Sequence, residues 1–285
     1  MLINTEAFVL KSRKFNEADS MLVLFSRKLG KASAVAKGSR RAKSKMLAGI
    51  QPFCYSDFML YKGRNLYTVT QVEAKRIFYP LREDYNKLTY ACYLVELVET
   101  EITEGQTHPQ LFSLFGKGLT LLSNPETIIL TLIRSFELHF MTVCGYEPML
   151  NQCMSCQTHE STGWWFNLTQ GGILCIDCRQ SQPEARKISA NCIKLARYLL
   201  AKKIDETVRL KIHPSLNNEL QEHMKVYMLH HLDRYQFKSL KMLEQTETLP
   251  VLDKKYAESV SLTDTIESDT FNENNHIERN DDQDE

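Results

Sequence analysis

Two pairs of cysteines have the spacing of a metal site. Cys153 and Cys156 form one Cys-x-x-Cys pair, Cys175 and Cys178 form the next, and eighteen residues separate the two pairs. Each pair directs two thiolates at one ion, and two pairs complete a tetrahedral set. Because four thiolates leave no position for water or substrate, we expect one structural Zn²⁺ ion, with iron or an iron-sulfur cluster as the alternative.

The cellular compartment decides how such cysteine pairs are interpreted. Residues 1–6 lack the cationic and apolar segments of a secretory signal, and no window of about 18 apolar residues predicts a membrane span. We therefore expect a cytoplasmic protein with no membrane partner, in which paired cysteines indicate metal rather than disulfides. Four other cysteines stand alone and are expected to be small core residues: Cys54, Cys92, Cys144 and Cys192.

A basic stretch is suited to an anionic partner. Five cations fall within the nine residues 37–45, which we call the basic loop: Lys37, Arg40, Arg41, Lys43 and Lys45. Clustered cations on a rigid scaffold neutralise phosphates and release counterions, which supplies most non-specific nucleic-acid affinity. The charge run alone fits a solvated loop without a partner equally well. Further cations of this candidate DNA surface lie at the ends of expected strands: Arg13, Lys14, Arg27, Lys28 and Lys31.

The formal net charge of zero conceals an uneven distribution. Residues 1–80 contain 15 Lys and Arg against 5 Asp and Glu, residues 81–250 contain 17 against 19, and residues 251–285 contain 3 against 11. The basic first part indicates an anionic partner. The acidic end is either a solvating segment or a competitor for that basic part.

The pattern of residues 1–80 predicts a small β-barrel. Apolar or β-prone runs alternate with polar segments about every ten residues, and the runs 53–61 and 66–72 form a hairpin by composition and loop length. Five short strands fit an OB-fold, the commonest five-stranded barrel that binds oligonucleotides, and an SH3-like barrel fits the same composition. Four aromatic residues could stack on bases, although alternation directs about half of them into the core: Phe53, Tyr55, Tyr61 and Tyr67.

Beyond residue 80 the apolar period becomes helical, which predicts an α+β chain. We expect a helical domain over residues 81–245, with the zinc ribbon inserted at about 150–180. Within it, Asn124-Pro125-Glu126 has the composition of a helix start. Residues 246–285 are too polar to bury a core and are expected to form an acidic disordered tail.

The sequence contains no signature of an enzyme. A phosphate-binding Walker loop is excluded because Gly116-Lys117-Gly118 lacks the upstream glycine, and no Gly-x-Ser-x-Gly elbow or kinase motif set occurs. Carboxylates at helical spacing, such as Glu96 and Glu99, fit a solvated face better than an acid-base pair. We therefore expect a protein without catalytic residues.

Several segments occur in an order that indicates a family. They are residues 17–31, 34–41, 49–53 and 145–148, followed by the cysteine pairs with Gly171-Gly172-Ile173-Leu174 before the second pair, and then Lys238-Ser239-Leu240. This order closely resembles the RecO family of bacterial recombination mediators. The resemblance covers about residues 1–245 and does not extend to the acidic tail.

The resemblance implies both a fold and a function. It implies an N-terminal OB-fold, a helical domain and an inserted zinc ribbon. It also implies a nucleoid-associated protein of RecF-type homologous recombination that binds single- and double-stranded DNA and anneals complementary strands. The implied partners are the single-strand-binding protein SSB and RecR, with which the protein helps load RecA on SSB-coated DNA.

Two other classes of protein remain compatible with the residues. One is a zinc-ribbon module that binds RNA or associates with transcription. The other is a metal hydrolase, against which the closed four-thiolate shell argues. A further hypothesis is that the acidic tail folds back on the basic first part and weakens non-specific binding.

Overall fold

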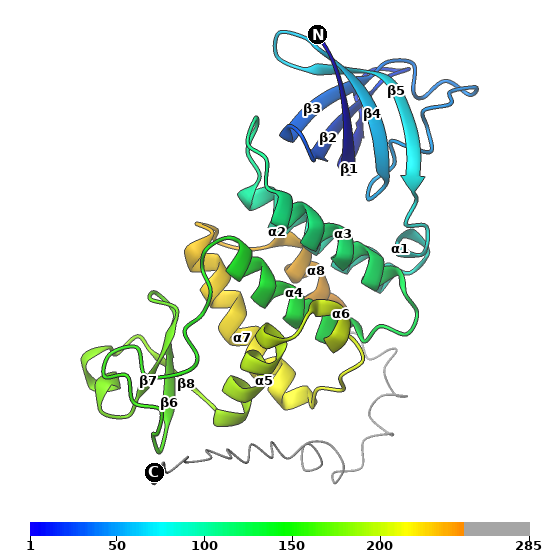
Figure 1. Cartoon of the computed structure of the whole chain (residues 1–285). Coiled ribbons are helices and arrows are strands. Elements are labelled where there is room, and N and C mark those ends of the chain that lie inside the picture. The colour runs from blue at the N-terminus through cyan, green and yellow to red at the C-terminus, as the bar shows by residue number, and fades with distance from the viewer. Residues whose placement is uncertain (248–285) are drawn as a thin grey trace, which may run out of the picture. The chain divides into compact units, whose positions relative to one another are not determined.

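Residues 1–247 are described by the structure, which is a computed structural model of the chain. The tail that the sequence predicts to be disordered lies outside these residues from 248 onward. A five-stranded barrel is followed by helices, and a three-stranded sheet is inserted between α4 and α5 (Figure 1). The helices of the described part are each too short or too polar to cross a membrane.

The barrel has the strand arrangement of an OB-fold. Its strands are β1 (Leu2–Lys14), β2 (Ser20–Ser26), β3 (Gly30–Ala36), β4 (Tyr55–Lys62) and β5 (Tyr67–Arg76). They close in the order β1-β2-β3-β5-β4, with β3 and β5 parallel and the other neighbours antiparallel. The predicted OB-fold is confirmed, and the order decides between the two barrels that composition left open.

Alternating side chains explain why these segments close into a barrel. Leu22 and Leu24 of β2 lie opposite Ala34 and Ala32 of β3, and all four are fully buried. Pairing large with small residues fills the narrow interior. Ile50, which follows the basic loop, joins the same core at 1% exposure. The chain between β3 and β4 therefore completes the barrel core in addition to connecting the strands.

The helices are held together by an apolar core that includes a buried polar cluster. They are α1 (Pro80–Glu83), α2 (Tyr85–Glu101), α3 (Pro109–Ser123), α4 (Ile129–Val143), α5 (Ala190–Ala201), α6 (Ile204–Thr207), α7 (Pro214–His231) and α8 (Lys238–Glu247). Tyr93 Oη donates to Glu137 Oε1 at 2.7 Å, and Arg134 Nη1 lies 2.9 Å from Glu137 Oε2. Burial raises the pKa of Glu137, and the Arg134 charge opposes that effect. The cluster thereby joins α2 to α4.

The predicted start of α4 is wrong. The helix begins at Ile129 and not at Asn124. Asn124 instead holds a turn, because its side-chain Oδ1 accepts from Glu126 N at 3.0 Å and its carbonyl accepts from Thr127 N at 3.4 Å. These bonds satisfy the local amides outside the helix.

The prediction for the isolated cysteines is confirmed for two of the four. Cys54 and Cys192 are buried, and Cys144 is half-buried. Cys92 is exposed, so its expected place in the core is wrong. The buried face of α2 is formed by other residues of the helix, including Ala91, Tyr93, Leu94, Val95 and Val98.

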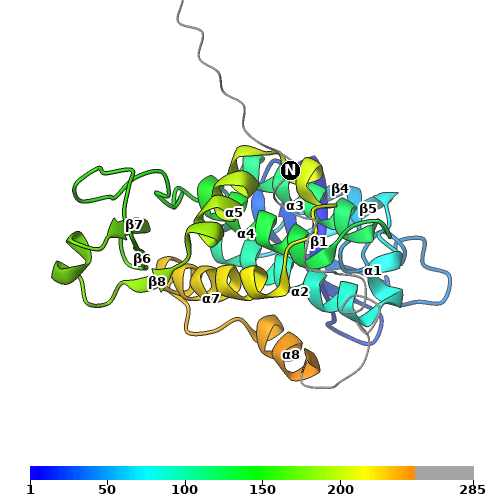
Figure 2. The same ribbon diagram turned by 90° about the horizontal axis from the view of Figure 1, so that it is seen from below.

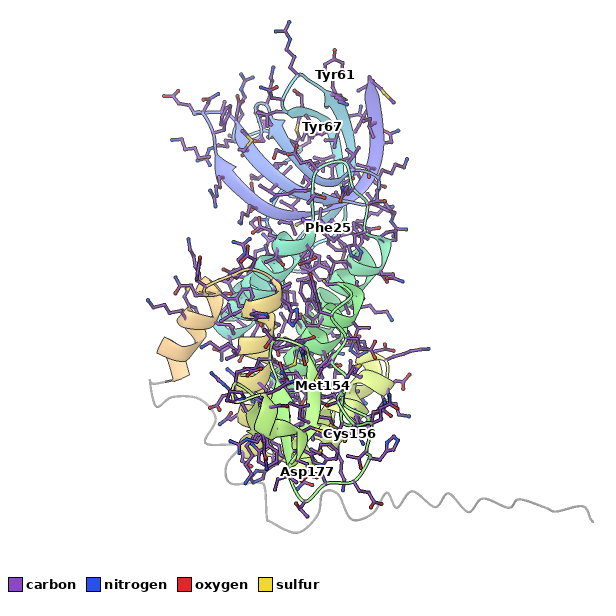
Figure 3. All side chains as sticks on the ribbon, turned by 90° about the vertical axis from the view of Figure 1, so that its left-hand side faces the viewer. Phe25, Tyr61, Tyr67, Met154, Cys156 and Asp177 are labelled. Carbon is purple, nitrogen blue, oxygen red and sulfur yellow. The ribbon has the colours of Figure 1, made fainter. Side chains whose placement is uncertain are left out.

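Aromatic side chains join the barrel to α3. The ring of Phe8 lies 4.9 Å from that of Phe112 and 5.2 Å from that of Phe115, and Phe25 lies 5.2 Å from Phe112. Figure 3 labels Phe25 at this junction. Such offset and edge-on pairs add to the free energy of burying the rings.

The inserted sheet packs on α7. Its strands are β6 (Trp164–Asn167), β7 (Gly172–Cys175) and β8 (Arg186–Ile188), in the order β7-β6-β8, and the short 3-10 helix η1 (Cys178–Ser181) follows β7. The ring of Phe166 lies 5.4 Å from that of Tyr227, edge to face, so β6 rests on α7 (Figures 1 and 2).

Candidate nucleic-acid interface and metal centre

The basic loop is tied to the turn between β1 and β2. Gly38 N donates to Asp19 Oδ1 at 2.8 Å, and Arg40 N donates to Ala18 O at 2.9 Å. The buried Ser39 hydroxyl donates to Ser20 Oγ at 2.9 Å. Three consecutive residues of the loop are therefore fixed to the barrel, which gives the cations a defined position.

Turns inside the loop direct its cations outward. Gly38 has a φ of +66°, which favours glycine, and its carbonyl accepts from Arg41 N at 3.2 Å. Ser44 N then donates to Arg41 O at 2.9 Å. All five cations of the loop are exposed, and within residues 1–247 none of them takes part in an ion pair. Their charges are thus available to a ligand.

The other five predicted cations divide between two ends of the β1–β2–β3 sheet. Lys14 lies opposite Ser20, beside the start of the basic loop, and Arg13 precedes it on β1. These two cations extend the charge of the loop. Arg27, Lys28 and Lys31 belong to the opposite end, where Ser26 faces Gly30. The two ends are six residue steps apart along β2, from Ser20 to Ser26, which corresponds to about 20 Å.

Arg27 is engaged within the protein. Its Nε lies 2.8 Å from Glu6 Oε2, and its guanidinium lies over the Phe112 ring at 5.1 Å. Arg27 and Lys28 also border a hollow of about 790 Å³ with Lys45, and Glu6, Asp57 and Glu73 are among its other lining residues. Arg27 and Lys28 therefore face acidic neighbours, and Lys45 of the basic loop borders the same hollow.

Alternation does not divide the hairpin aromatics, because Tyr55 and Tyr61 lie on the same, outer face of β4. Phe53 is buried, Tyr55 stacks on Phe8 at 4.8 Å, and Tyr67 is half-buried, whereas Tyr61 is 51% exposed. Figure 3 labels Tyr61 and Tyr67 at the β4–β5 end of the barrel. Two exposed cations follow Tyr61 in that turn and were missed by sequence reasoning: Lys62 and Arg64. The signal was the Lys62-Gly63-Arg64-Asn65 turn itself, because the β4–β5 loop of an OB-fold lines its oligonucleotide site.

The four predicted cysteines converge on one point. The sulfur atoms of Cys153, Cys156, Cys175 and Cys178 all lie within 4.8 Å of one another. Cys156 Sγ lies 3.7 Å from Cys175 Sγ, whereas ligands about 2.3 Å from a tetrahedral Zn²⁺ lie about 3.8 Å apart. The sulfur positions therefore fit a tetrahedral metal ion. Figure 3 labels Cys156 in the turn that precedes β6.

Backbone amides prepare one of these sulfurs for a cation. Desolvation opposes ionisation of Cys153, but amides of Cys156, Cys175 and Ser155 are directed at its sulfur, and the pKa falls to about 6. Cys175 N lies 3.4 Å from Cys153 Sγ. Amide donors to ligating sulfurs orient the ligands and balance the thiolate charge. The group can thus hold a metal ion.

The fold and the two sites define a class of protein: an OB-fold barrel with an exposed basic loop, joined to a helical domain that contains a four-cysteine metal site. The family model for the N-terminal domain of recombination protein O matches residues 1–78, and that for the C-terminal domain matches residues 82–241. The chain belongs to the RecO family.

Relatives named DNA repair protein RecO share most of this length. The protein of Alkaliphilus metalliredigens is 49% identical over 245 residues, which cover 86% of this chain and all of that protein. The protein of Acetivibrio thermocellus is 33% identical over 232 residues, covering 81% and 92% respectively. That of Moorella thermoacetica is 34% identical over 235 residues, covering 82% and 87%.

Proposed function

We propose that this protein is a DNA-binding recombination mediator that acts in DNA repair. The observation that supports the proposal is the basic loop, which carries five exposed cations. Hydrogen bonds to Asp19, Ala18 and Ser20 tie this loop to the OB-fold barrel. Point charges on a fixed loop hold phosphates and read no base sequence. The protein therefore binds strands without choosing among them.

The proposed order of events is the one known for the RecO family. The protein binds single- and double-stranded DNA, anneals complementary strands, engages SSB and RecR, and with RecR helps load RecA on SSB-coated DNA. These roles call for no catalytic residue, and the protein works in the cytoplasm on the nucleoid. The domain limits that we propose are residues 1–80 for DNA binding, 81–245 for partners and metal, and 246–285 for the tail.

The metal proposed for the cysteine site is one structural Zn²⁺ ion. Four thiolates at tetrahedral spacing suit zinc, and a full shell leaves no site for chemistry. Its role is to fold the segment between α4 and α5. Binding energy at such a site contributes directly to folding.

The salt dependence of DNA binding tests the basic loop. In the five-alanine variant, Lys37, Arg40, Arg41, Lys43 and Lys45 are each replaced by Ala. Each lost contact to a single strand lowers the slope of log affinity against log salt by about 0.7, so a reduction of up to about 3.5 is expected. A variant with Arg234→Ala and Lys241→Ala, which are exposed outside the barrel, serves as the control.

An unchanged slope in the five-alanine variant would remove the basic loop from the DNA site. RNA of matched length distinguishes the other class of function. If RNA outcompetes single-stranded DNA and the protein does not anneal SSB-coated complementary strands, the protein is an RNA-binding module and the proposal fails.

A further inference from the structure

A second basic segment lies in the helical domain. Residues 186–211 contain eight Lys and Arg against two Asp and Glu. The segment comprises β8, α5 and α6 and is far in sequence from the basic loop. Charge counted over residues 81–250 conceals it, because acidic residues elsewhere in that range cancel the excess.

Helix α5 presents part of this charge on one face. Lys194 and Tyr198 of α5 and the C-cap residue Lys202, which we together call the α5 stripe, follow one another at intervals of four residues. All three are exposed, with Tyr198 at 43%. Residues four apart on a helix share a face and rise by about 6 Å. The orientation of α5 is fixed because its other face is buried through Cys192, Ile193, Ala196 and Leu199.

The charges around the α5 stripe remain positive in sum. Lys203 follows directly and is exposed, and within residues 1–247 neither it nor the stripe lysines form an ion pair. Of the two acids in the segment, Asp205 lies 3.6 Å from Lys117 of α3, so it already faces a cation. Glu206 is the other acid of the segment, and Glu219 of α7 is held at the start of α5, where its Oε1 accepts from Ser189 N at 2.6 Å.

We propose that the α5 stripe is a second binding surface for single-stranded DNA. A tyrosine ring between two cations offers a base a stacking platform, while each lysine meets a flanking phosphate. An acidic peptide would use the lysines but would gain no stacking on Tyr198, so the composition of the stripe favours a nucleic acid. The inference rests on the proposed function, because a second strand surface would let one protein hold both of the strands that it anneals.

Charge reversal in the full-length protein tests the two lysines. The α5 variant carries Lys194→Glu and Lys202→Glu, and the control carries Arg234→Glu and Lys241→Glu, which change the net charge equally at exposed positions outside residues 186–211. For binding to oligothymidine, the slope of log affinity against log salt should be about 1.4 smaller in the α5 variant than in wild type. This corresponds to the loss of two phosphate contacts. The slope of the control should exceed that of the α5 variant.

A capture experiment tests whether the surface holds a second strand. A biotinylated oligothymidine is saturated with protein, and a labelled strand of non-complementary sequence is added so that base pairing plays no part. Wild type and the control should retain the second strand, and the α5 variant should retain several-fold less. Equal retention and an equal salt slope in the α5 variant and the control overturn the inference.

Replacing Tyr198 separates DNA from an acidic protein partner. Tyr198→Ala should weaken binding to oligothymidine about fivefold or more and leave binding to an abasic oligonucleotide of equal length unchanged. Equal effects on both ligands, together with competition by poly-glutamate that depends on Lys194 and Lys202, would assign the surface to acidic proteins and overturn the inference. A wild-type protein that binds no oligonucleotide would overturn the proposed function instead.

Discussion

The carboxylate of Asp19 accepts a 2.8 Å hydrogen bond from the amide of Gly38, which joins the β1–β2 turn to the basic loop. This bond lowers the pKa of Asp19, and the Asn16 side chain and the charges of Lys37 and Arg41 lower it further. An acid inside a cation cluster thus anchors the loop without forming an ion pair with any of its cations. The loop thus holds its charges in place without a ligand, which would reduce the entropy lost when an anionic partner binds.

Acid titration should reveal this anchor. Because the pKa of Asp19 is below its ordinary value of 3.8 in the folded protein, the bond contributes stability above that value and is lost as pH falls through the lowered pKa. The amide resonance of Gly38 should therefore shift with a midpoint below pH 3.8. Asp19→Asn keeps an acceptor oxygen but cannot titrate, so it should abolish the shift. A midpoint at or above 3.8 would contradict the anchor.

Gly30 should be essential to the contact between the barrel and the helical domain. Its φ is +64°, and a Cβ atom there would overlap the carbonyl oxygen of Gln106 in the loop between α2 and α3. Gly30→Ala should therefore lower the free energy of unfolding by about 2 kcal/mol or more.

Gly105 provides a matched control for this substitution. Its φ is +77°, but a Cβ atom would meet nothing within 4 Å. Gly105→Ala should therefore cost only the backbone strain of about 1 kcal/mol. Urea denaturation of both variants measures the difference, and equal losses would show that the close approach to Gln106 carries no energy.

Removing one thiolate should empty the metal site and weaken the fold around it. Purified protein should contain one Zn²⁺ per chain, and Cys175→Ser should lose it and melt several degrees lower, because metal binding contributes to folding. Cys92→Ser alters an exposed cysteine outside the site and should keep the full metal content. Elemental analysis and thermal melting with and without a chelator provide the measurements. A Cys175→Ser variant that retains one equivalent of zinc would argue against the four-thiolate site.

Glu96 of α2 should hold the start of α8. Its Oε1 accepts from Lys238 N at 2.9 Å, and its Oε2 accepts from Ser239 N at 3.0 Å and from the Ser239 hydroxyl at 2.6 Å. A carboxylate at a helix N-terminus satisfies free amides and complements the helix dipole, so Glu96→Ala should cost about 1–2 kcal/mol. Amide exchange at residues 238–242 should accelerate accordingly.

Glu83→Ala, at an exposed position of α1, is the control for that exchange measurement. It should leave exchange at residues 238–242 at the wild-type rate. If Glu96→Ala also exchanges at that rate, Glu96 does not stabilise α8.

The acidic tail offers a prediction from charge alone, since residues 251–285 lie outside the described part of the chain. With 11 acids against 3 cations it should compete with DNA for the basic loop, so its deletion should raise affinity at low salt. A tail of equal length with Gln and Asn in place of Glu and Asp should have the same effect as deletion. Wild-type affinity in both variants would exclude competition by charge.

Local spacing made the metal site and the barrel predictable from sequence. Each Cys-x-x-Cys turn brings two sulfurs together within a few residues, and short apolar runs about ten residues apart predicted the strands of the barrel. Both patterns follow from backbone geometry over short distances. The prediction that α4 starts at Asn124 was wrong because an Asn side chain can accept a backbone hydrogen bond in a turn as well as at a helix start. Only contacts with the rest of the protein decide between the two.

The sequence by itself determined which residues could bind metal or phosphate, and the tertiary structure decided which of them act together. Ten cations were predicted for one DNA surface, yet Arg27 is occupied by Glu6 and Phe112. The basic loop is instead anchored by Asp19, and its cations form no ion pair within residues 1–247. The exposed face of α5 likewise became visible only when packing buried its other side. The physical reason is that these contacts join residues distant in sequence, whose meeting depends on how the whole chain closes.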